Sequence, residues 1–434
     1  MTSFSATQAH FPIMSSHCLI IGAGVIGLTT AYALLQRGHR VTLLDACREV
    51  GMGTSYANGG QLSYRYVAPL ADAGVPLQAL GWMLNRDSPL TFRPQLDLQQ
   101  WRWCAAFIAA CRRSVNQRNG QRLLQLALLS QQQLHLWQAQ SPLADFSWRC
   151  NGKLVVYRRP QALSRAAASL VAPDSQQVLN RQQLLALEPS LAGMAEQLSG
   201  AIFTPGDEVG DCHLFCQALL GYLQQQTHFQ LLEQCPVTAL TQHAGQIQAI
   251  ETDLGPLQAD HYILTAGMGS YELAGALGLR LPLYPLKGYS LTLPLAEEAV
   301  APHISVTDYE RKMVYARLPA TGTLPQRLRV AAMVDIGVQD TLITPRRIQS
   351  LRQQATASFP AAGDFAQAHS WAGLRPATPT GLPVIGATRW GNLWLNIGHG
   401  ALGFTLACGS ATLLAEQLSG QPASISLDGL TLGY

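Results

Sequence analysis

The hydrophobic pattern near the start of the chain predicts a strand, a glycine turn, a helix and a second strand. CLIIG is a short apolar run typical of a buried strand, LTTAYALLQRG has helical periodicity and ends at Gly38, and HRVTLLD is a second strand-like run. These runs follow one another between Cys18 and Leu44. The segment is therefore expected to form a βαβ unit.

The rest of the chain alternates between two patterns. Short β-like runs separated by turn residues, such as GKLVVYR and KMVYARL, fall around 150–160 and 283–340 and are typical of an antiparallel sheet. HYILTAGMGS and the tail after Asn392 repeat the strand-then-glycine pattern of the first unit. We therefore expect an α/β plus α+β fold, in which a substrate domain on a mixed or antiparallel sheet is inserted into a discontinuous, Rossmann-like nucleotide-binding domain.

The expected domain boundaries follow this alternation. The nucleotide-binding domain is assigned to 17–75, 195–280 and 370–434, and the substrate domain to 76–194 and 281–369. Residues 1–16 are expected to form a flexible extension, because they lack the basic start and apolar centre of a signal peptide. No run in the sequence approaches the roughly 18 apolar residues that a membrane span needs.

The segment from Leu77 to Gln140 is mainly helical in pattern and combines tryptophans with arginines. These residues are Trp82, Trp101, Trp103 and Trp137, together with Arg112, Arg113, Arg118 and Arg122. Two interpretations are open. The segment presents either a solvated helix face or a basic, aromatic-bearing surface that touches anionic lipid or a partner.

Composition narrows the function classes. The formal net charge of +3 on 434 residues gives no support for a nucleic-acid partner. Nine cysteines without a CxxC pair fit neither a metal site nor a dense disulfide framework and indicate a reducing, cytoplasmic setting. Lysine occurs only at Lys153, Lys287 and Lys312, which makes each of them a candidate for closer inspection.

The glycine pattern after the first strand indicates a dinucleotide site. Gly22 permits a tight turn, Gly24 lets the backbone approach a pyrophosphate, and Gly27 lets the helix pack on the strand. Asp45 ends the second strand near the spacing at which a carboxylate takes ribose hydroxyls, and it would repel a 2′-phosphate. FAD and NAD(H) both remain open on this evidence.

Two further stretches favour FAD. Small hydroxyl and amide side chains among the glycines of 54–61 suit a diphosphate and a flavin ring, and the turn at 398–400 opens a helix whose N-terminus could face the flavin. The expected cofactor contacts are Ile21, Gly22, Ala23, Gly24, Val25, Ile26, Gly27, Asp45, Thr54, Ser55, Asn58, Gly60, Gln61, Val237, Ala266, Gly267, Gly398, His399, Gly400, Leu402, Gly403, Phe404 and Thr405.

One arginine lies in an apolar stretch near the C-terminus. WAGLRPATPTGLPVIG carries Arg375 among Gly, Pro and apolar residues, and an arginine rarely enters such a setting unless an anion meets it there. We expect Arg375 to lie in a turn held by Gly373, Pro376 and Pro379 and to bind an anionic ligand.

The motifs GAGVIG, TSYANGGQLS, YPLKGYSLT, WAGLRPATPTGLPVIG and NLWLNIGHGALGFTLACGS resemble those of the bacterial FAD-dependent D-amino acid dehydrogenases, within the glycine oxidase and D-amino acid oxidase superfamily. The resemblance covers nearly the whole chain beyond the N-terminal extension. It implies non-covalent FAD, hydride transfer from the α-carbon of a D-amino acid to flavin N5, and hydrolysis of the imino acid to a 2-oxo acid and ammonia.

The resemblance also assigns roles to individual residues. It implies that Arg375 grips the substrate carboxylate, that Arg317 and Tyr315 lie near the same pocket, and that Lys287 is a cation beside the flavin. The alternative for Lys287 is an ordinary strand residue. Tyr289 or Tyr315 could close the pocket or bind the carboxylate, and the alternative for each is a position in the core. It further implies a quinone-type electron acceptor and a peripheral contact with the cytoplasmic face of the inner membrane.

Several alternatives stay open at the level of sequence. The substrate on the same scaffold could instead be glycine, sarcosine, proline or hydroxyproline. An NAD-dependent reductase would share only the first βαβ unit, and a flavin-binding subunit could relay electrons inside a larger complex. The preferred D-amino acid, the choice between oxygen and quinone, and the oligomeric state are left undetermined by these residues.

Overall fold

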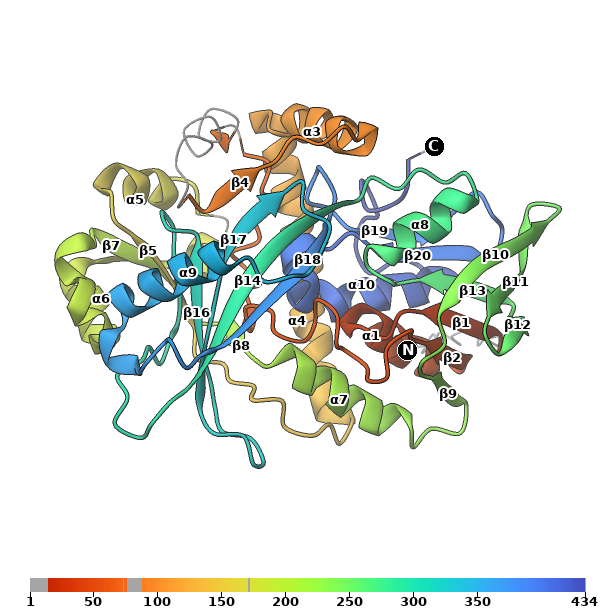
Figure 1. The fold of residues 1–434 in the computed structure, drawn as a ribbon, viewed down its shortest axis with the longest axis horizontal. Helices are drawn as coiled ribbons and strands as arrows, with labels where there is room; N and C mark the ends of the chain where they lie inside the picture. The colour runs from red at the N-terminus through yellow and green to blue at the C-terminus, as the bar shows by residue number, and fades with distance from the viewer. Residues whose placement is uncertain (1–14, 73, 76–87, 171, 434) are drawn as a thin grey trace, which may run out of the picture.

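The computed structural model describes residues 15–72, 74–75, 88–170 and 172–433. A six-stranded sheet forms the centre of one half of the molecule (Figure 1). Its strands are, in order, β19 (Val384–Ala387), β20 (Leu393–Ile397), β13 (His261–Leu264), β1 (His17–Ile21), β2 (Arg40–Leu44) and β9 (Phe229–Leu232). All neighbouring strands run parallel except β19, which is antiparallel to β20.

Both faces of this sheet are covered, which explains why its strands are almost continuously apolar. On one face, Ile20 and Leu43 pack against helices, and on the other, Leu19 and Leu44 pack against a small sheet and a short helix. The covering elements are α1 (Val25–Leu35), α4 (Arg113–Gln140), α7 (Cys212–Leu223), α8 (Gly269–Ala276), α10 (Gly403–Leu418), β10 (Val237–His243), β11 (Gln246–Thr252) and β12 (Gly255–Leu257). Because β1 and β2 pair in parallel and α1 connects them, the predicted βαβ unit is confirmed.

A nine-stranded sheet forms the other half (Figure 1). Its main path is β18 (His369–Ala377), β14 (Tyr284–Pro294), β17 (Arg327–Ile336), β16 (Met313–Leu318), β15 (Ser305–Asp308), β5 (Lys153–Tyr157), β7 (Gly200–Thr204) and β6 (Gln177–Asn180), while β4 (Leu90–Phe92) pairs with β17. Parallel pairs occur at β15–β5 and β17–β4, and the other pairs are antiparallel. The expectation of a mixed or antiparallel sheet is confirmed.

Shorter elements complete this half and join it to the first. Helix α9 (Pro345–Ser358) packs Leu351 and Ala355 on one face of the sheet. The remaining elements are α3 (Leu98–Ala110), α5 (Pro160–Ala167), α6 (Arg181–Leu187), β3 (Gln61–Leu62), β8 (Glu208–Val209) and the 3₁₀ turns η1 (Pro173–Ser175), η2 (Pro189–Gln197), η3 (Pro360–Ala362) and η4 (Gly400–Leu402).

A buried ion cluster ties the two halves together. Asp211 caps α7 by accepting hydrogen bonds from the backbone of His213 and Leu214, and it also accepts bonds from Arg327 and Arg329 of β17 at 2.8 and 3.3 Å. Burial alone would raise the pKa of this carboxyl, but the two guanidinium groups outweigh burial and hold the pKa below its usual range.

Some predicted boundaries differ from this arrangement. Residues 200–204 form β7 of the large sheet, although they were assigned to the nucleotide-binding domain. Helix α4 was assigned to the substrate domain, but its Leu123, Leu126 and Trp137 belong to the same core as α1 and α10. Helical periodicity identified α4 correctly; it could not indicate which sheet the apolar face of the helix covers.

The helical segment after residue 77 is also only partly as expected. Trp82 and residues 1–14 of the extension lie outside the described residues. Trp103 and Trp137 are core residues, and Trp101 is the exposed tryptophan of α3. The side chains of Arg112, Arg113 and Arg118 are exposed, whereas Arg122 is half-buried 4.0 Å from Asp428. No helix among the described residues is long and apolar enough to cross a membrane.

Candidate active site

A large cleft runs between the two sheets. Its volume is about 2650 Å³, well above the roughly 300–1,000 Å³ of most small-molecule pockets. Of the residues expected to contact a cofactor, all line this cleft except Ala23 and Gly27. The predicted cofactor residues come from parts of the sequence that are far apart, and the fold brings them together along one cleft. These parts are 21–26, 54–61, 237, 266–267 and 398–405.

Glycine is required at the first turn for two different reasons. Gly22 has φ +106°, and a Cβ there would lie 2.7 Å from the Cα atom of Ala266. A Cβ at Gly27 would lie 1.8 Å from the carbonyl oxygen of Gly22, so the helix could not approach the strand. Gly27 therefore acts through packing, as predicted, although it does not line the cleft.

Asp45 fastens this turn to the second strand. One carboxylate oxygen accepts a hydrogen bond from Ala23 N at 2.6 Å, and the other accepts from Cys47 N at 2.8 Å. Asp45 also lines the cleft. Its binding of ribose hydroxyls stays a prediction; the carboxylate already has a structural role in shaping the glycine turn.

Several polar side chains of the 54–61 loop are already bonded to protein. Ser55 Oγ accepts from Val25 N at 3.1 Å at the start of α1, and Thr54 Oγ1 donates to Leu374 O at 2.7 Å. Asn58 Oδ1 accepts from Gly60 N at 3.0 Å. These bonds hold the loop across the cleft, between α1 and β18, and leave its backbone and its small side chains along the cleft wall.

The turn after β20 leads into the N-terminus of α10, where no side chain caps the first helical turn. Gly403, Phe404 and Thr405 of this turn line the cleft, so the positive end of the helix dipole faces it. His399 is buried, and burial lowers its pKa to about 3. Its Nε2 lies 3.1 Å from Ser410 Oγ, which indicates a neutral, structural histidine.

The residues present fit a dinucleotide cofactor. A Cβ at Gly53 of the cleft wall would meet no atom within 4 Å, and Gly53 does not have the positive φ that would itself favour glycine, so space for a ligand is left beside it. The N-termini of α1 and α10 both open into the cleft and are suited to anionic or electron-rich groups. FAD would be held by the loops at 21–26, 54–61 and 398–405.

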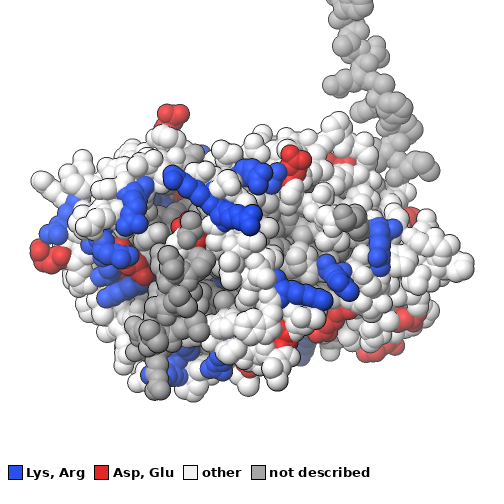
Figure 2. All heavy atoms as spheres, turned by 90° about the horizontal axis from the view of Figure 1, so that it is seen from above, with Lys and Arg blue, Asp and Glu red and all other residues white. Residues whose placement is uncertain are grey.

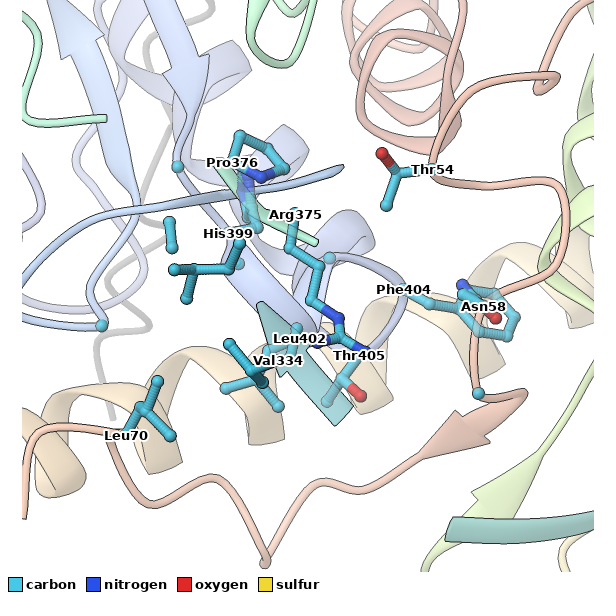
Figure 3. A pocket seen from close by; sticks show the side chains of 18 of the residues that line it. Thr54, Asn58, Leu70, Val334, Arg375, Pro376, His399, Leu402, Phe404 and Thr405 are labelled. Carbon is cyan, nitrogen blue, oxygen red and sulfur yellow. The ribbon is translucent and has the colours of Figure 1, made fainter. Parts of the chain in front are cut away.

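Arg375 lies in the same cleft, on a different element from the one predicted. It belongs to strand β18 and pairs with Leu286 of β14, so the expected turn is wrong; Gly and Pro here occupy an edge strand. Figure 3 shows its side chain extending into the pocket. Burial lowers the pKa of the guanidinium to about 10, opposed by the nearby Asp335, so the group is charged at neutral pH.

Two backbone features make room for the guanidinium of Arg375. Strand β17 has a bulge where Met333 and Val334 face the single residue Gly288 of β14, and Met333 takes φ +68°. The Met333 carbonyl oxygen accepts a hydrogen bond from Arg375 Nη1 at 3.1 Å. A Cβ on Gly288 would lie 2.2 Å from Arg375 Nη2, so any side chain at this position would displace the guanidinium.

Three other predicted residues do not reach the cleft. Lys287 is buried with its ammonium group 2.8 Å from Asp340 Oδ1 and 2.5 Å from Leu342 O, which contradicts its expected place beside the cofactor. Tyr315 is a core residue whose hydroxyl donates to Ser358 Oγ at 2.9 Å. Arg317 bonds Gln326 Oε1 at 2.7 Å on the sheet face away from the cleft.

These errors have one cause. Alternate residues of a strand point to opposite faces, and Val314 of β16 lines the cleft, so Tyr315 turns away from it. Tyr289 borders the cleft, but its ring is buried in the same core as Leu291, and its hydroxyl donates to Asp335 Oδ2 at 2.8 Å. Burial raises the pKa of Tyr289 to about 12, so this hydroxyl stays protonated.

Sequence reasoning missed Lys153. Its ammonium group is buried in the cleft wall and donates to Gln61 Oε1 at 2.9 Å and to Ser63 Oγ at 2.6 Å. Burial lowers its pKa to about 8. The scarcity of lysine singled it out, but no motif connected it to the cofactor.

Comparison with known proteins agrees with this geometry. Residues 17–417 match the family model described as DAO, FAD dependent oxidoreductase. The chain is 54% identical over 417 residues to D-amino acid dehydrogenase 2 of Pseudomonas aeruginosa, covering 96% of this chain and 98% of that one. It is 44% identical over 419 residues to D-amino acid dehydrogenase 2 of Ralstonia nicotianae, with coverage of 94% and 97%.

Among solved structures, glycine oxidase from Geobacillus kaustophilus is similar in fold. The TM-score is 0.73 at 21% identity, and the match covers 96% of this chain and 98% of that one. At this level of identity the likeness concerns the arrangement of the two sheets and the cleft between them.

Proposed function

The chain belongs to the DAO family of FAD-dependent oxidoreductases, and from this premise we propose that it oxidises D-amino acids to imino acids, which hydrolyse to 2-oxo acids and ammonia. The observation that carries the proposal is Arg375, a charged guanidinium in the wall of the cleft that holds the cofactor loops. Names of relatives at 54% and 44% identity support the same substrate class.

Arg375 supplies the recognition of the α-carboxylate. The nearby carboxylate of Asp335 is already paired with Arg347 at 2.8 Å and bonded by Thr91 and Tyr289. It therefore does not neutralise Arg375 by direct contact, and the guanidinium fork is available to a substrate.

The walls around Arg375 are largely apolar. Leu286, Ala332, Met333, Val334 and Leu402 line this part of the cleft. An apolar wall displaces water and strengthens the pairing of the guanidinium with a carboxylate. When Arg375 fixes the carboxylate, the D- and L-enantiomers place the α-hydrogen and the side chain in opposite positions. Only one enantiomer can therefore direct its α-hydrogen at the flavin.

FAD supplies the acceptor for the hydride that leaves the substrate α-carbon. The chain holds the carboxylate at Arg375 and aims the N-terminus of α10 into the cleft, where it favours the negative charge that accompanies reduction. Since no base is needed for hydride loss from a neutral amine, the neutral His399 and protonated Tyr289 fit this scheme as binding and packing groups.

We place the electron acceptor in the quinone class and propose a peripheral membrane contact through α3. Leu98, Trp101 and Ile108 are 62%, 49% and 59% exposed, with exposed Arg102 on the same helix and Arg112 just beyond it. Figure 2 views the molecule from the side on which α3 lies in Figure 1 and shows basic groups spread over that face. Apolar and cationic side chains together suit an anionic lipid surface.

The substrate proposal is tested by mixing the holoenzyme anaerobically with a panel of D-amino acids, glycine, sarcosine and L-proline and following the flavin absorbance. D-amino acids are expected to bleach the flavin fastest. Faster bleaching by glycine, sarcosine or proline would assign a different amine substrate to the same scaffold, and intact flavin with every amine would indicate an electron-relay role. Reoxidation by a quinone analogue rather than oxygen then tests the acceptor.

A further inference from the structure

We propose that Lys153 supplies, from strand β5 of the nine-stranded sheet, the positive charge that stabilises reduced FAD, the role that the sequence resemblance gave to Lys287. The inference rests on FAD binding by this chain and needs no assumption about the substrate. Lys153 is a positioning residue, because it bonds the side chains of Gln61 and Ser63 in the loop that lines the cofactor cleft. Its charge would also raise the reduction potential of the bound FAD.

The contacts of Lys153 place its charge at the cofactor loop. The ammonium group donates to the side chains of Gln61 and Ser63 at 2.9 and 2.6 Å and lies 4.5 Å from the centroid of the Tyr66 ring. Lys153 is 3% exposed and lines the cleft, as do Gln61 and Ser63. A buried ammonium group with three polar or aromatic neighbours is a built feature of the wall, since burying an unpaired charge is costly.

A second positive element converges on the same short segment. Ser63 N donates to Thr405 Oγ1 at 3.2 Å, and Thr405 Oγ1 donates to Gln61 O at 3.5 Å, so the first turn of α10 is bonded to β3 and the residue after it. The segment 61–63 is therefore held between the uncapped N-terminus of α10 and the ammonium group of Lys153. The helix belongs to the half built on the six-stranded sheet, and Lys153 belongs to the nine-stranded sheet.

Asp207 is the anionic neighbour that helps to keep Lys153 charged. Asp207 is buried, accepts from Tyr64 N at 3.1 Å and lies 3.9 Å from Arg65, and its second oxygen has no partner among the described residues. Asp207 favours the charged ammonium but makes no direct contact with it. Burial lowers the pKa of Lys153 to about 8, so the ammonium form predominates at neutral pH.

Lys287 provides a matched control. It is equally buried, at 1% exposure, on the same nine-stranded sheet, but its ammonium group is bonded to Asp340 and Leu342 and does not line the cleft. A change of charge at Lys287 should therefore alter the stability of the protein without altering the cofactor.

The test measures the reduction potential of the bound FAD in the holoenzyme, without any amino acid. Lys153→Gln keeps a hydrogen-bonding side chain and removes the charge, whereas Lys153→Arg keeps the charge. The Gln variant is expected to shift the ratio of reduced to oxidised FAD at a fixed potential at least tenfold toward the oxidised form, equivalent to about 30 mV for a two-electron couple. The Arg variant and Lys287→Gln should match the unmodified protein.

The measured potentials distinguish a charge effect of Lys153 from a general loss of stability. Equal potentials for the Lys153→Gln variant and the unmodified protein, or equal shifts in the Lys153→Gln and Lys287→Gln variants, would overturn the proposal. Loss of FAD from both Lys153 variants would overturn it too, because one of them keeps the charge. Loss from Lys153→Gln alone, with a normal potential in Lys153→Arg, would support it. None of these results depends on which substrate the enzyme oxidises.

Discussion

Replacing Arg375 with lysine keeps a positive charge in the cleft and removes the planar fork. Arg375 Nη1 donates to Met333 O at 3.1 Å, and no other hydrogen bond to this guanidinium is found within the described part of the chain. The remaining N–H groups can therefore meet a carboxylate. The pKa of about 10 keeps the wild-type group charged at pH 7, so the change tests geometry rather than charge.

The magnitude follows from the number of bonds lost. A guanidinium gives a carboxylate two parallel charge-assisted hydrogen bonds, and an ammonium group gives one. A bond of this kind contributes about 1.5–3 kcal/mol, and about 1.4 kcal/mol is tenfold in affinity. Arg375→Lys should therefore weaken apparent D-amino acid binding roughly 10- to 100-fold.

The assay is anaerobic stopped-flow reduction of the flavin over a range of D-amino acid concentrations, which separates half-saturation from the limiting rate. Arg317→Lys is the matched control, because Arg317 lies on the same sheet but bonds Gln326 outside the cleft. An Arg375→Lys variant with full FAD content and unchanged half-saturation would refute the assignment of Arg375 as the carboxylate ligand.

Gly288→Ala places a Cβ 2.2 Å from Arg375 Nη2, so the guanidinium must move and half-saturation should rise roughly tenfold; an unchanged value in the stopped-flow assay contradicts this. Asp211→Asn leaves Arg327 and Arg329 without their shared counter-ion and should cost about 3–5 kcal/mol in urea unfolding; a loss below about 1 kcal/mol argues against the cluster. Burial lowers the pKa of His399 in the folded protein from 6.5 to about 3. Between these two pH values the unfolded chain binds a proton at His399 that the folded protein does not bind. Stability is lost in that window, by about 2 kcal/mol at pH 5, and His399→Gln should flatten this acid loss; equal slopes in the two proteins would contradict it.

The cofactor half of the site could be predicted because its signals are local. Gly22, Gly27 and Asp45 have fixed spacings around one turn, and the geometry of that turn demands glycine at the first two positions and is held by the carboxylate of the third. Arg375 was identifiable as a charge in an apolar stretch. The predicted turn around Arg375 was wrong, because glycine and proline in an edge strand give the same sequence pattern as a turn.

The substrate half was less predictable because it depends on strand register. A one-residue difference decides whether a side chain enters the cleft or the core, which is why Lys287, Tyr315 and Arg317 were misplaced. The bulge at Met333 shifts the register again and has no glycine to mark it. Lys153 became visible only when β5 was brought against the 61–63 segment by long-range pairing.

The central claim is that this FAD enzyme takes D-amino acids by their carboxylate. The most direct measurement is the rate of anaerobic flavin bleaching by the two enantiomers of the same apolar amino acid, in the unmodified protein and in Arg375→Lys. The account predicts fast bleaching by the D-enantiomer, little by the L-enantiomer, and a half-saturation for the D-enantiomer that rises in the variant. Equal rates for both enantiomers, or an L-enantiomer that reduces the flavin faster, would contradict it.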